Sequence, residues 1–163
     1  MRLLTTLFAL VTLLTSVAAL AQHEGPAMNF IRIDDRLATG GHLTDGGLDA
    51  LKADGVEVVI DLRDEPPEGH GERLAKQGIE WINVPVVWRS PEEKDFELFR
   101  EAMKKHGSDN VFVQCQANYR ASAMTYLYRV LEDGVPEAEA RKAMNEIWEP
   151  SGTWEEYIGG LLE

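Results

Sequence analysis

The chain contains a single cysteine, Cys115, and an arginine, Arg120, follows it five positions later. An apolar, strand-like segment ends at the cysteine, and a helix-like segment begins beside the arginine. The first turn of a helix presents free N–H groups that bind anions and stabilise a thiolate, and arginine grips oxyanions with parallel hydrogen bonds. These residues predict a thiolate nucleophile beside an oxyanion-holding loop. A lone cysteine can also be a small buried hydrophobe, and the surrounding chain favours the first interpretation.

Composition limits the class of protein. The chain has 163 residues, with 16 basic and 28 acidic side chains and a formal net charge of −12. Such an acidic surface repels nucleic acid and anionic lipid, so we expect neither as a partner, and a local pocket must hold any bound anion. The length suits one domain with a single core and is too short for two ordinary domains.

Residues 1–21 are typical of a secretory signal peptide. Arg2 precedes an apolar run, and Ala19-Leu20-Ala21 has the small-x-small pattern of a cleavage site. The apolar part is short and interrupted by hydroxyl residues, which argues against a membrane-spanning anchor. We expect a periplasmic or secreted protein with no stable membrane anchor after cleavage. Residues 22–29 would form a flexible leader and residues 30–163 a single domain.

Hydrophobic patterns predict alternating strands and helices. Runs rich in β-branched residues predict strands, and apolar residues at helical spacing predict helices. The expected strands span about 31–33, 56–62, 79–84 and 111–115, and the expected helices about 44–54, 72–77, 91–106, 117–133 and 136–149. This order predicts an α/β fold: a single layered domain with a central, mostly parallel sheet flanked by helices. Cys115 then lies at the carboxyl edge of the sheet, where ligands bind.

Some local features follow from the same patterns. Thr39 to His42 is expected to form a turn, and Thr44 and Ser90 are expected to cap the helices that follow them. The segment 56–62 is apolar on both faces, so it is expected to be the central strand of the sheet.

Four segments of the chain resemble one known family. They are Ile33-Asp-Asp-Arg-Leu-Ala-Thr-Gly-Gly-His-Leu-Thr44, residues 55–63 with Val59-Ile-Asp-Leu-Arg63, residues 78–85, and the cysteine loop with its following helices to Pro150. Their content and order resemble the small bacterial dual-specificity and tyrosine-phosphatase-like proteins, in particular the phosphatase-like domain of beta-lactamase-hydrolase-like proteins. The resemblance covers about residues 30–150 and implies that residues 30–163 form a phosphatase-like domain.

The resemblance implies a mechanism. In that family a cysteine thiolate attacks phosphorus, while an arginine and loop N–H groups hold the phosphate oxygens, and no cofactor takes part. Cys115 would be the nucleophile and Arg120 the phosphate clamp. A phosphorylated small molecule or a phosphoprotein would be the substrate. The residues implied to contact it are Gln116, Ala117, Asn118 and Tyr119, with the Ser122 hydroxyl helping the thiolate to leave.

Three features differ from the pattern of that family. Four residues separate Cys115 from Arg120, where five are usual, so the loop is shortened. Gln114 replaces the usual histidine before the cysteine. Pro85 to Arg89, where the family has its general acid, contains no carboxylate. The acidic residues that follow shortly afterwards are typical of the first turn of a helix.

Alternative functions remain open. Cys115-Gln-Ala-Asn-Tyr-Arg120 and Ile60-Asp-Leu-Arg63 are also similar to rhodanese-type sulfurtransferases, whose persulfide chemistry needs no general acid. A module of the same fold could instead bind an oxyanion or a partner without turnover. The four histidines lack ligand spacing, so no metal site is predicted. Asp61 and Arg63 are expected to form a structural ion pair beside the loop.

Overall fold

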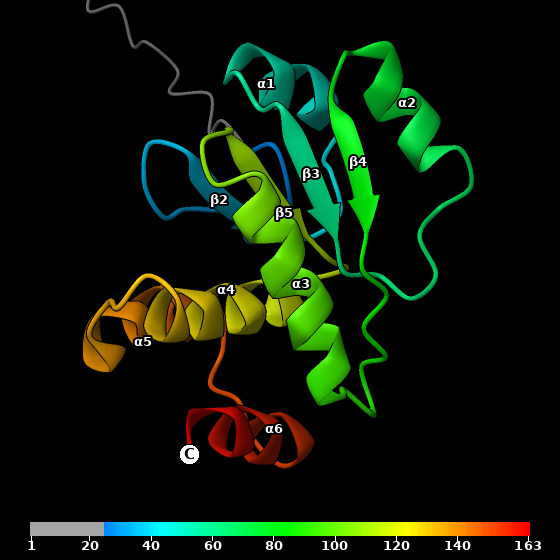
Figure 1. Cartoon of the computed structure of the whole chain (residues 1–163). Helices are drawn as coiled ribbons and strands as arrows, with labels where there is room; N and C mark the ends of the chain where they lie inside the picture. The colour runs from blue at the N-terminus through cyan, green and yellow to red at the C-terminus, as the bar shows by residue number, and fades with distance from the viewer. Residues whose placement is uncertain (1–24) are drawn as a thin grey trace, which may run out of the picture.

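The strands of residues 25–163 in the computed structural model form one five-stranded sheet, in the order β1-β2-β5-β3-β4 (Figure 1). The predicted signal peptide lies outside the described residues. β1 pairs antiparallel with β2, and the other pairings are parallel. The predicted α/β fold with a mostly parallel sheet is therefore confirmed. The strands are β1 (Ile31–Arg32), β2 (Leu37–Gly40), β3 (Val58–Asp61), β4 (Glu80–Asn83) and β5 (Val111–Gln114).

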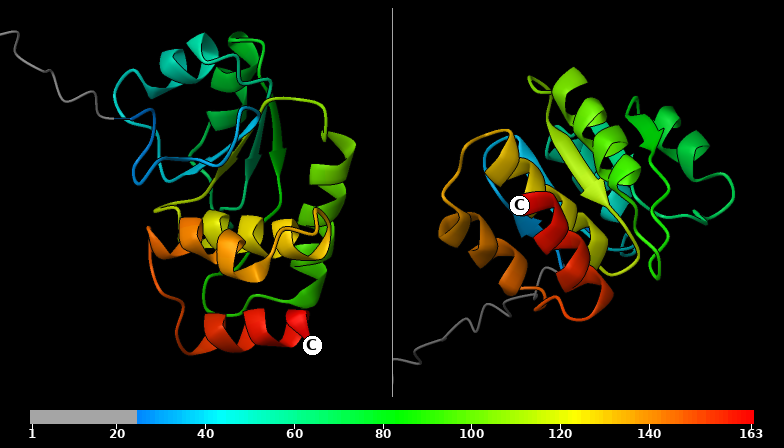
Figure 2. Two further views of the ribbon diagram at one scale, coloured as in Figure 1. Left: turned by 90° about the vertical axis from the view of Figure 1, so that its left-hand side faces the viewer. Right: turned by 60° about the horizontal axis from the view of Figure 1, so that its bottom comes forward.

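Helices cover both faces of the sheet. The helices are α1 (Gly47–Ala53), α2 (His70–Lys76), α3 (Glu93–Lys105), α4 (Tyr119–Leu131), α5 (Glu137–Asn145) and α6 (Thr153–Leu162). α1 and α2 pack on one face, and α3 and α4 pack on the other. α5 and α6 each contact α4, and α6 lies at the end of the molecule far from α1 and α2 (Figure 2). No helix within residues 25–163 combines the length and hydropathy needed to cross a bilayer.

The central strands are buried on both faces. Along β3, Val58 and Ile60 pack in the core under α3 and α4, whereas Val59 packs in the core under α1 and α2. Side chains alternate in the same way at the end of β5. Cys115 joins the core on the α4 side, and Gln114 bonds to α2 on the opposite side. The side chains of these two consecutive residues therefore lie on opposite faces of the sheet.

The presence of β2 shows that two predictions were wrong: the turn that begins at Thr39, and the central position of the segment 56–62. Thr39 and Gly40 do not form a turn, because they end a fully buried strand that pairs with β5. Gly40 serves close packing instead, since a Cβ atom there would lie 2.7 Å from the ring of Phe112 and 2.8 Å from Ala27 Cβ. Because β2 lies on its other side, β5 and not the segment 56–62 is the centre of the sheet.

The helix starts also differ from expectation. α1 does not begin at Thr44, because that hydroxyl donates to the carbonyl of Gly25 at 3.0 Å and caps no helix. α3 is capped by Glu92 and not by Ser90, through a reciprocal capping box with Asp95. α6 lies beyond the predicted helices, and its residues Trp154 and Ile158 pack in the core.

The described part of the predicted leader is packed on the domain. Ala27 is 4% exposed and forms an isolated bridge with Leu43. The carbonyl of Met28 accepts a hydrogen bond from the N–H of Gly41 at 2.7 Å. Residues 25–29 therefore belong to the domain, because the start of this segment fills the face that α1 and α2 leave open.

We predict that Gly47→Ala destabilises the fold. Gly47 is buried, and a Cβ atom there would clash with the carbonyl oxygen of Pro26. A backbone oxygen moves only together with its packed segment, so we expect a loss of about 1–3 kcal/mol in the free energy of unfolding. Urea unfolding monitored by circular dichroism measures this loss.

The matched control is Gly159→Ala in α6, where an added Cβ would meet no atom within 4 Å. Alanine is the better helix former by about 0.5–1 kcal/mol, so this variant should keep or raise the stability. Equal unfolding midpoints for the two variants would contradict the close contact at Gly47.

Candidate active site

The loop after β5 carries the predicted nucleophile. Cys115 follows β5 directly and is 2% exposed, and its N–H donates to the carbonyl of Gly40 at 3.1 Å. Asn118 is the N-cap residue of α4 and has a φ of 67°. Asparagine tolerates this left-handed conformation better than most residues do. Strand, tight loop and helix therefore succeed one another within a few residues.

The backbone of this loop is rich in free donors. Within residues 25–163, the N–H groups of residues 116–121 donate no hydrogen bond, whereas those of Cys115 and Ser122 on either side are bonded. Residues 119–121 form the first turn of α4, where free N–H groups are normal, and residues 116–118 add the donors of the loop. A run of free N–H groups at a helix start is an anion-binding arrangement.

The carbonyl groups of the loop are bonded from behind. Asn29 Nδ2 donates to the Ala117 carbonyl at 3.0 Å, and Asn118 Nδ2 donates to the Asn29 carbonyl at 2.6 Å. The N–H of His42 donates to the Gln116 carbonyl at 3.0 Å. The loop therefore keeps its N–H donors free, whereas the carbonyl acceptors of Gln116 and Ala117 are already bonded. Sequence reasoning missed Asn29, and no pattern around it indicated this contact.

Arg120 is buried, and only one edge of its guanidinium is hydrogen-bonded within the described chain. Its Nη1 atom donates to Asp64 Oδ1 at 2.8 Å and to the Val86 carbonyl at 2.6 Å. Nε and Nη2 form no hydrogen bond with any other part of the described chain. One edge of the guanidinium therefore remains available for a bidentate contact with an oxyanion. We call this the free edge of Arg120.

Asp64 anchors this arginine. The hydrogen bond from Arg120 lowers the pKa of the Asp64 carboxyl below its usual value, against a smaller opposing effect of burial. A carboxyl with a lowered pKa is ionised near neutral pH, so it suits an anchor better than a proton donor. Glu92 and Asp95 are engaged with each other's backbone in the capping box of α3, as their position in the sequence suggests.

Aromatic rings form a wall beside the loop. Tyr119 stacks on Trp148 with ring centroids 5.1 Å apart, and Trp88 lies 5.5 Å from Trp148 and 5.3 Å from Trp154. Ser122 Oγ donates to the Tyr119 carbonyl at 3.0 Å and accepts from Trp148 Nε1 at 3.2 Å. The hydroxyl of Ser122 thus positions Trp148. Its role in helping the thiolate to leave stays a prediction.

Gln114, the residue before the nucleophile, faces away from the loop. Its Oε1 atom accepts a hydrogen bond from His70 Nε2 at 2.9 Å, and its Nε2 atom donates to the Gly41 carbonyl at 3.2 Å. The side chain of Gln114 therefore links α2 to the segment that follows β2, on the other side of the sheet from Cys115.

The expected ion pair of Asp61 and Arg63 is present at the end of β3. Arg63 Nη2 lies 2.6 Å from Asp61 Oδ2, and Nε lies 2.9 Å from Oδ1. Both side chains are buried, so two parallel hydrogen bonds offset the cost of removing the charges from water. Asn83 Nδ2 donates to both backbone carbonyls of the pair.

The structure places Cys115, residues 116–119 and Arg120 in one strand–loop–helix segment, as the sequence predicts. Sequence reasoning missed Asn29, Asp64 and Val86, which hold the loop and its arginine from distant parts of the chain. Across residues 25–163, no group of three or more histidine, cysteine, aspartate or glutamate side chains is arranged to hold a metal ion.

This sheet order, with a cysteine loop between the central strand and a buried helix, defines a protein of the tyrosine-phosphatase-like class. A family model described as "DSP-PTPase phosphatase fused to NAD+ Kinase" matches residues 10–156, and the chain belongs to this phosphatase family. A search of curated proteins finds no match.

Solved structures share the fold. A DUF442 protein from Shewanella putrefaciens CN-32 superimposes with a TM-score of 0.73 at 28% identity, over 83% of this chain and 89% of that chain. TpbA of P. aeruginosa superimposes with a TM-score of 0.66 at 15% identity, over 82% of this chain and 84% of its own. The second likeness concerns the fold alone. The resemblance inferred from the sequence is confirmed at the level of family and fold.

We predict that His70 makes the stability depend on pH. Burial lowers the pKa of His70 below its usual value of 6.5, the charges of Arg63 and Arg73 lower it further, and Asp61 and the hydrogen bond to Gln114 oppose the shift. The unfolded chain therefore binds this proton at a higher pH than the folded chain. The stability due to the neutral ring is complete above pH 6.5 and is lost as the pH falls toward the folded-state pKa.

Urea unfolding at steps from about pH 7.5 to about pH 5 tests this dependence. We expect the slope of wild type to be reduced in His70→Gln, whose amide can still donate to Gln114. His42→Gln, a change at an exposed histidine nearby, should keep the wild-type slope. Identical slopes for wild type and His70→Gln would exclude His70 as the source.

Proposed function

We propose that this chain is a cysteine-dependent phosphoric monoester hydrolase. The observation that carries the proposal is the run of free N–H groups at residues 116–121, which begins directly after Cys115 and includes Arg120 with its free edge. Donors fixed before the reaction stabilise the charge on phosphoryl oxygens. Membership of the phosphatase family supports the same reaction.

In the proposed reaction the Cys115 thiolate attacks phosphorus. An S–P bond forms as the P–O bond to the leaving group breaks, which gives a cysteinyl phosphate. Water then attacks phosphorus, the S–P bond breaks, and inorganic phosphate leaves while the thiolate is restored. The N–H groups of the loop and the free edge of Arg120 hold the phosphoryl oxygens in both steps.

The leaving group must depart with little help from a proton donor. Asp64 contacts the loop arginine but is held ionised, and the segment from Pro85 to Arg89 has no carboxylate. A leaving group that is stable as an anion needs no protonation in the transition state. We therefore propose that the protein favours phosphate esters of acidic alcohols, such as aryl phosphates, over alkyl phosphates.

The proposed substrate is a phosphorylated small molecule or a phosphoprotein. Trp88 and Tyr119 are 38% and 37% exposed beside the loop, and their rings can pack against a flat group that carries the phosphate. The net charge of −12 argues against a nucleic acid substrate, because a polyanion would be repelled over the rest of the surface.

Hydrolysis of para-nitrophenyl phosphate under reducing conditions tests the proposal. We expect turnover by wild type and complete loss in Cys115→Ser, because a hydroxyl in this loop is a far weaker nucleophile than a thiolate. Arg120→Ala should lower kcat by about 10²–10³-fold, the range for loss of a preorganised oxyanion donor. Lys142→Ala, at an exposed position of α5, is the control and should keep full activity.

Assays of the same wild-type and variant proteins distinguish a phosphatase from a sulfurtransferase and from a non-catalytic module. Persulfide chemistry requires no proton donor, so the lack of an available carboxylate favours a sulfurtransferase as the second candidate. Thiocyanate formation from thiosulfate and cyanide, with a persulfide mass shift on Cys115, would support that candidate. If wild type is inert in both assays yet binds vanadate in calorimetry, the non-catalytic oxyanion-binding module replaces both enzymes.

We also propose that the protein is exported to the periplasm or secreted, because of the sequence of residues 1–21. Mass spectrometry of the protein after expression of the whole chain in a bacterial host should find an N-terminus at Gln22 in the periplasmic or extracellular fraction. Ala19→Lys disrupts the small-x-small pattern and should block this cleavage. An intact N-terminus in the cytoplasmic fraction would contradict export.

A further inference from the structure

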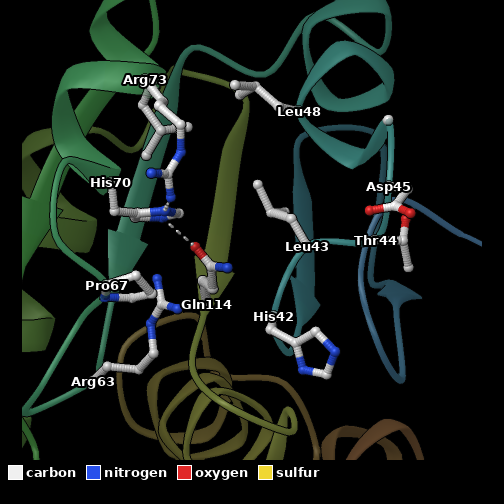
Figure 3. A pocket seen from close by; sticks show the side chains of 12 residues that line it. His42, Leu43, Thr44, Asp45, Leu48, Arg63, Pro67, His70, Arg73 and Gln114 are labelled. Carbon is white, nitrogen blue, oxygen red and sulfur yellow. Dashed lines mark hydrogen bonds between the residues drawn. The ribbon is translucent and has the colours of Figure 1, made fainter.

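A cavity opens on the other face of β5 from the cysteine loop (Figure 3). Its volume is ≈ 340 Å³, at the lower end of the range for small-molecule sites. It lies between the segment before α1, the start of α2 and the end of β5, where Gln114 contributes to its wall. Cys115 and Arg120 do not line it, so this cavity is separate from the candidate active site.

One wall of the cavity carries guanidinium groups. Arg73 forms no salt bridge within residues 25–163: Nη1 donates to the Glu68 carbonyl at 3.2 Å, and Nη2 lies 3.4 Å from His70 Nδ1. Arg63 is paired with Asp61 through Nε and Nη2, which leaves its Nη1 atom without a hydrogen bond in the described chain. Figure 3 shows both arginines on the side of the cavity where His70 lies.

The buried polar groups of this wall are hydrogen-bonded to one another or to the backbone. His70 and Gln114 are 4% and 0% exposed and share a hydrogen bond of 2.9 Å. The neutral ring donates from Nε2 to Gln114 and accepts from Arg73 at Nδ1, and Gln114 in turn donates to the Gly41 carbonyl. Because these groups satisfy one another, the donors left for a ligand belong to Arg73 and Arg63.

The opposite wall is partly apolar. Leu43 and Leu48 lie across the cavity from the arginines, on the side that also carries His42, Thr44 and Asp45 (Figure 3). Leu74 of α2 adds to the apolar lining. A ligand that fits both walls has an anionic end and an apolar body. Asp61 offsets the charge of Arg63, and Asp45 on the opposite wall forms no salt bridge with either arginine, so Arg73 has no carboxylate partner among the described residues. The guanidinium fork of Arg73 can therefore hold one planar carboxylate.

We propose that this cavity binds a small monocarboxylate, with the carboxylate on Arg73 and the apolar body against Leu43 and Leu48. The inference does not depend on the reaction at Cys115, because the site lies on the opposite face of the sheet and shares no lining residue with the loop.

Titration of the purified protein with benzoate, followed by NMR of assigned leucine methyl groups and backbone amides, tests the proposal. We expect saturable shifts at Leu43 and Leu48. Benzamide, which has the shape of benzoate without its charge, should bind at least about tenfold more weakly, because it lacks the charge-assisted hydrogen bonds. Arg73→Ala should weaken benzoate binding by a similar factor.

The matched control is Lys76→Ala, which removes an exposed positive charge from the same helix at a residue outside the cavity. This variant should bind benzoate as wild type does. Three results would overturn the proposal: no saturable methyl shifts, equal affinity in wild type and Arg73→Ala, or shifts confined to the amides of residues 116–118. The last result would place the anion in the cysteine loop.

Discussion

The pairing of β5 with strands on both sides determines where chemistry can occur in this protein. The last backbone bonds of this ladder run from Leu62 N–H to the Gln114 carbonyl at 2.7 Å and from Cys115 N–H to the Gly40 carbonyl at 3.1 Å. Beyond them the chain leaves the sheet apart from an isolated bridge between Gly41 and Ala117, and the N–H groups of residues 116–121 donate no hydrogen bond within the described residues. The same ladder sets the alternation that sends Gln114 to one face and Cys115 to the other. Both the candidate active site and the cavity beside Gln114 follow from this geometry.

Free donors in a loop are costly unless something fixes the loop around them. A buried polar group without a partner costs about 1–3 kcal/mol, and flexible donors would close on nearby carbonyls. Here Asn29 and His42 occupy the carbonyls of the loop, and Asn118 takes up the left-handed turn. The donors are therefore fixed before any anion arrives, which is the condition for electrostatic stabilisation of a transition state.

Arg120 shows how charge is distributed at this site. Asp64 and the Val86 carbonyl hold one nitrogen of the guanidinium and leave its other edge free. This arrangement fixes the orientation of the side chain, but the carboxylate that does so is held ionised by the same contact. The site is thus well supplied with groups that bind an oxyanion and poorly supplied with proton donors. That imbalance is the physical reason for expecting acidic leaving groups in the proposed reaction.

The sequence predicted the layered fold, the elements around Cys115, and the ion pair of Asp61 and Arg63. Prediction from the sequence was wrong where one residue type can have two structural roles. Gly40 suggested a turn and instead allows close packing in β2, and Thr44 suggested a helix cap but bonds to the carbonyl of Gly25. Polar residues near the N-terminus suggested a flexible leader, although residues 25–29 help to build the site.

By itself the sequence determined which residues stand at the junction of β5 and α4, because strand periodicity, the helix start and the spacing of Cys115 and Arg120 are local properties. Only the tertiary structure decided what surrounds them. Asn29 meets Asn118 across 89 positions, and Asp64 meets Arg120 across 56. Such contacts arise when helices and loops pack on a completed sheet, and the local patterns of a single sequence do not reveal them.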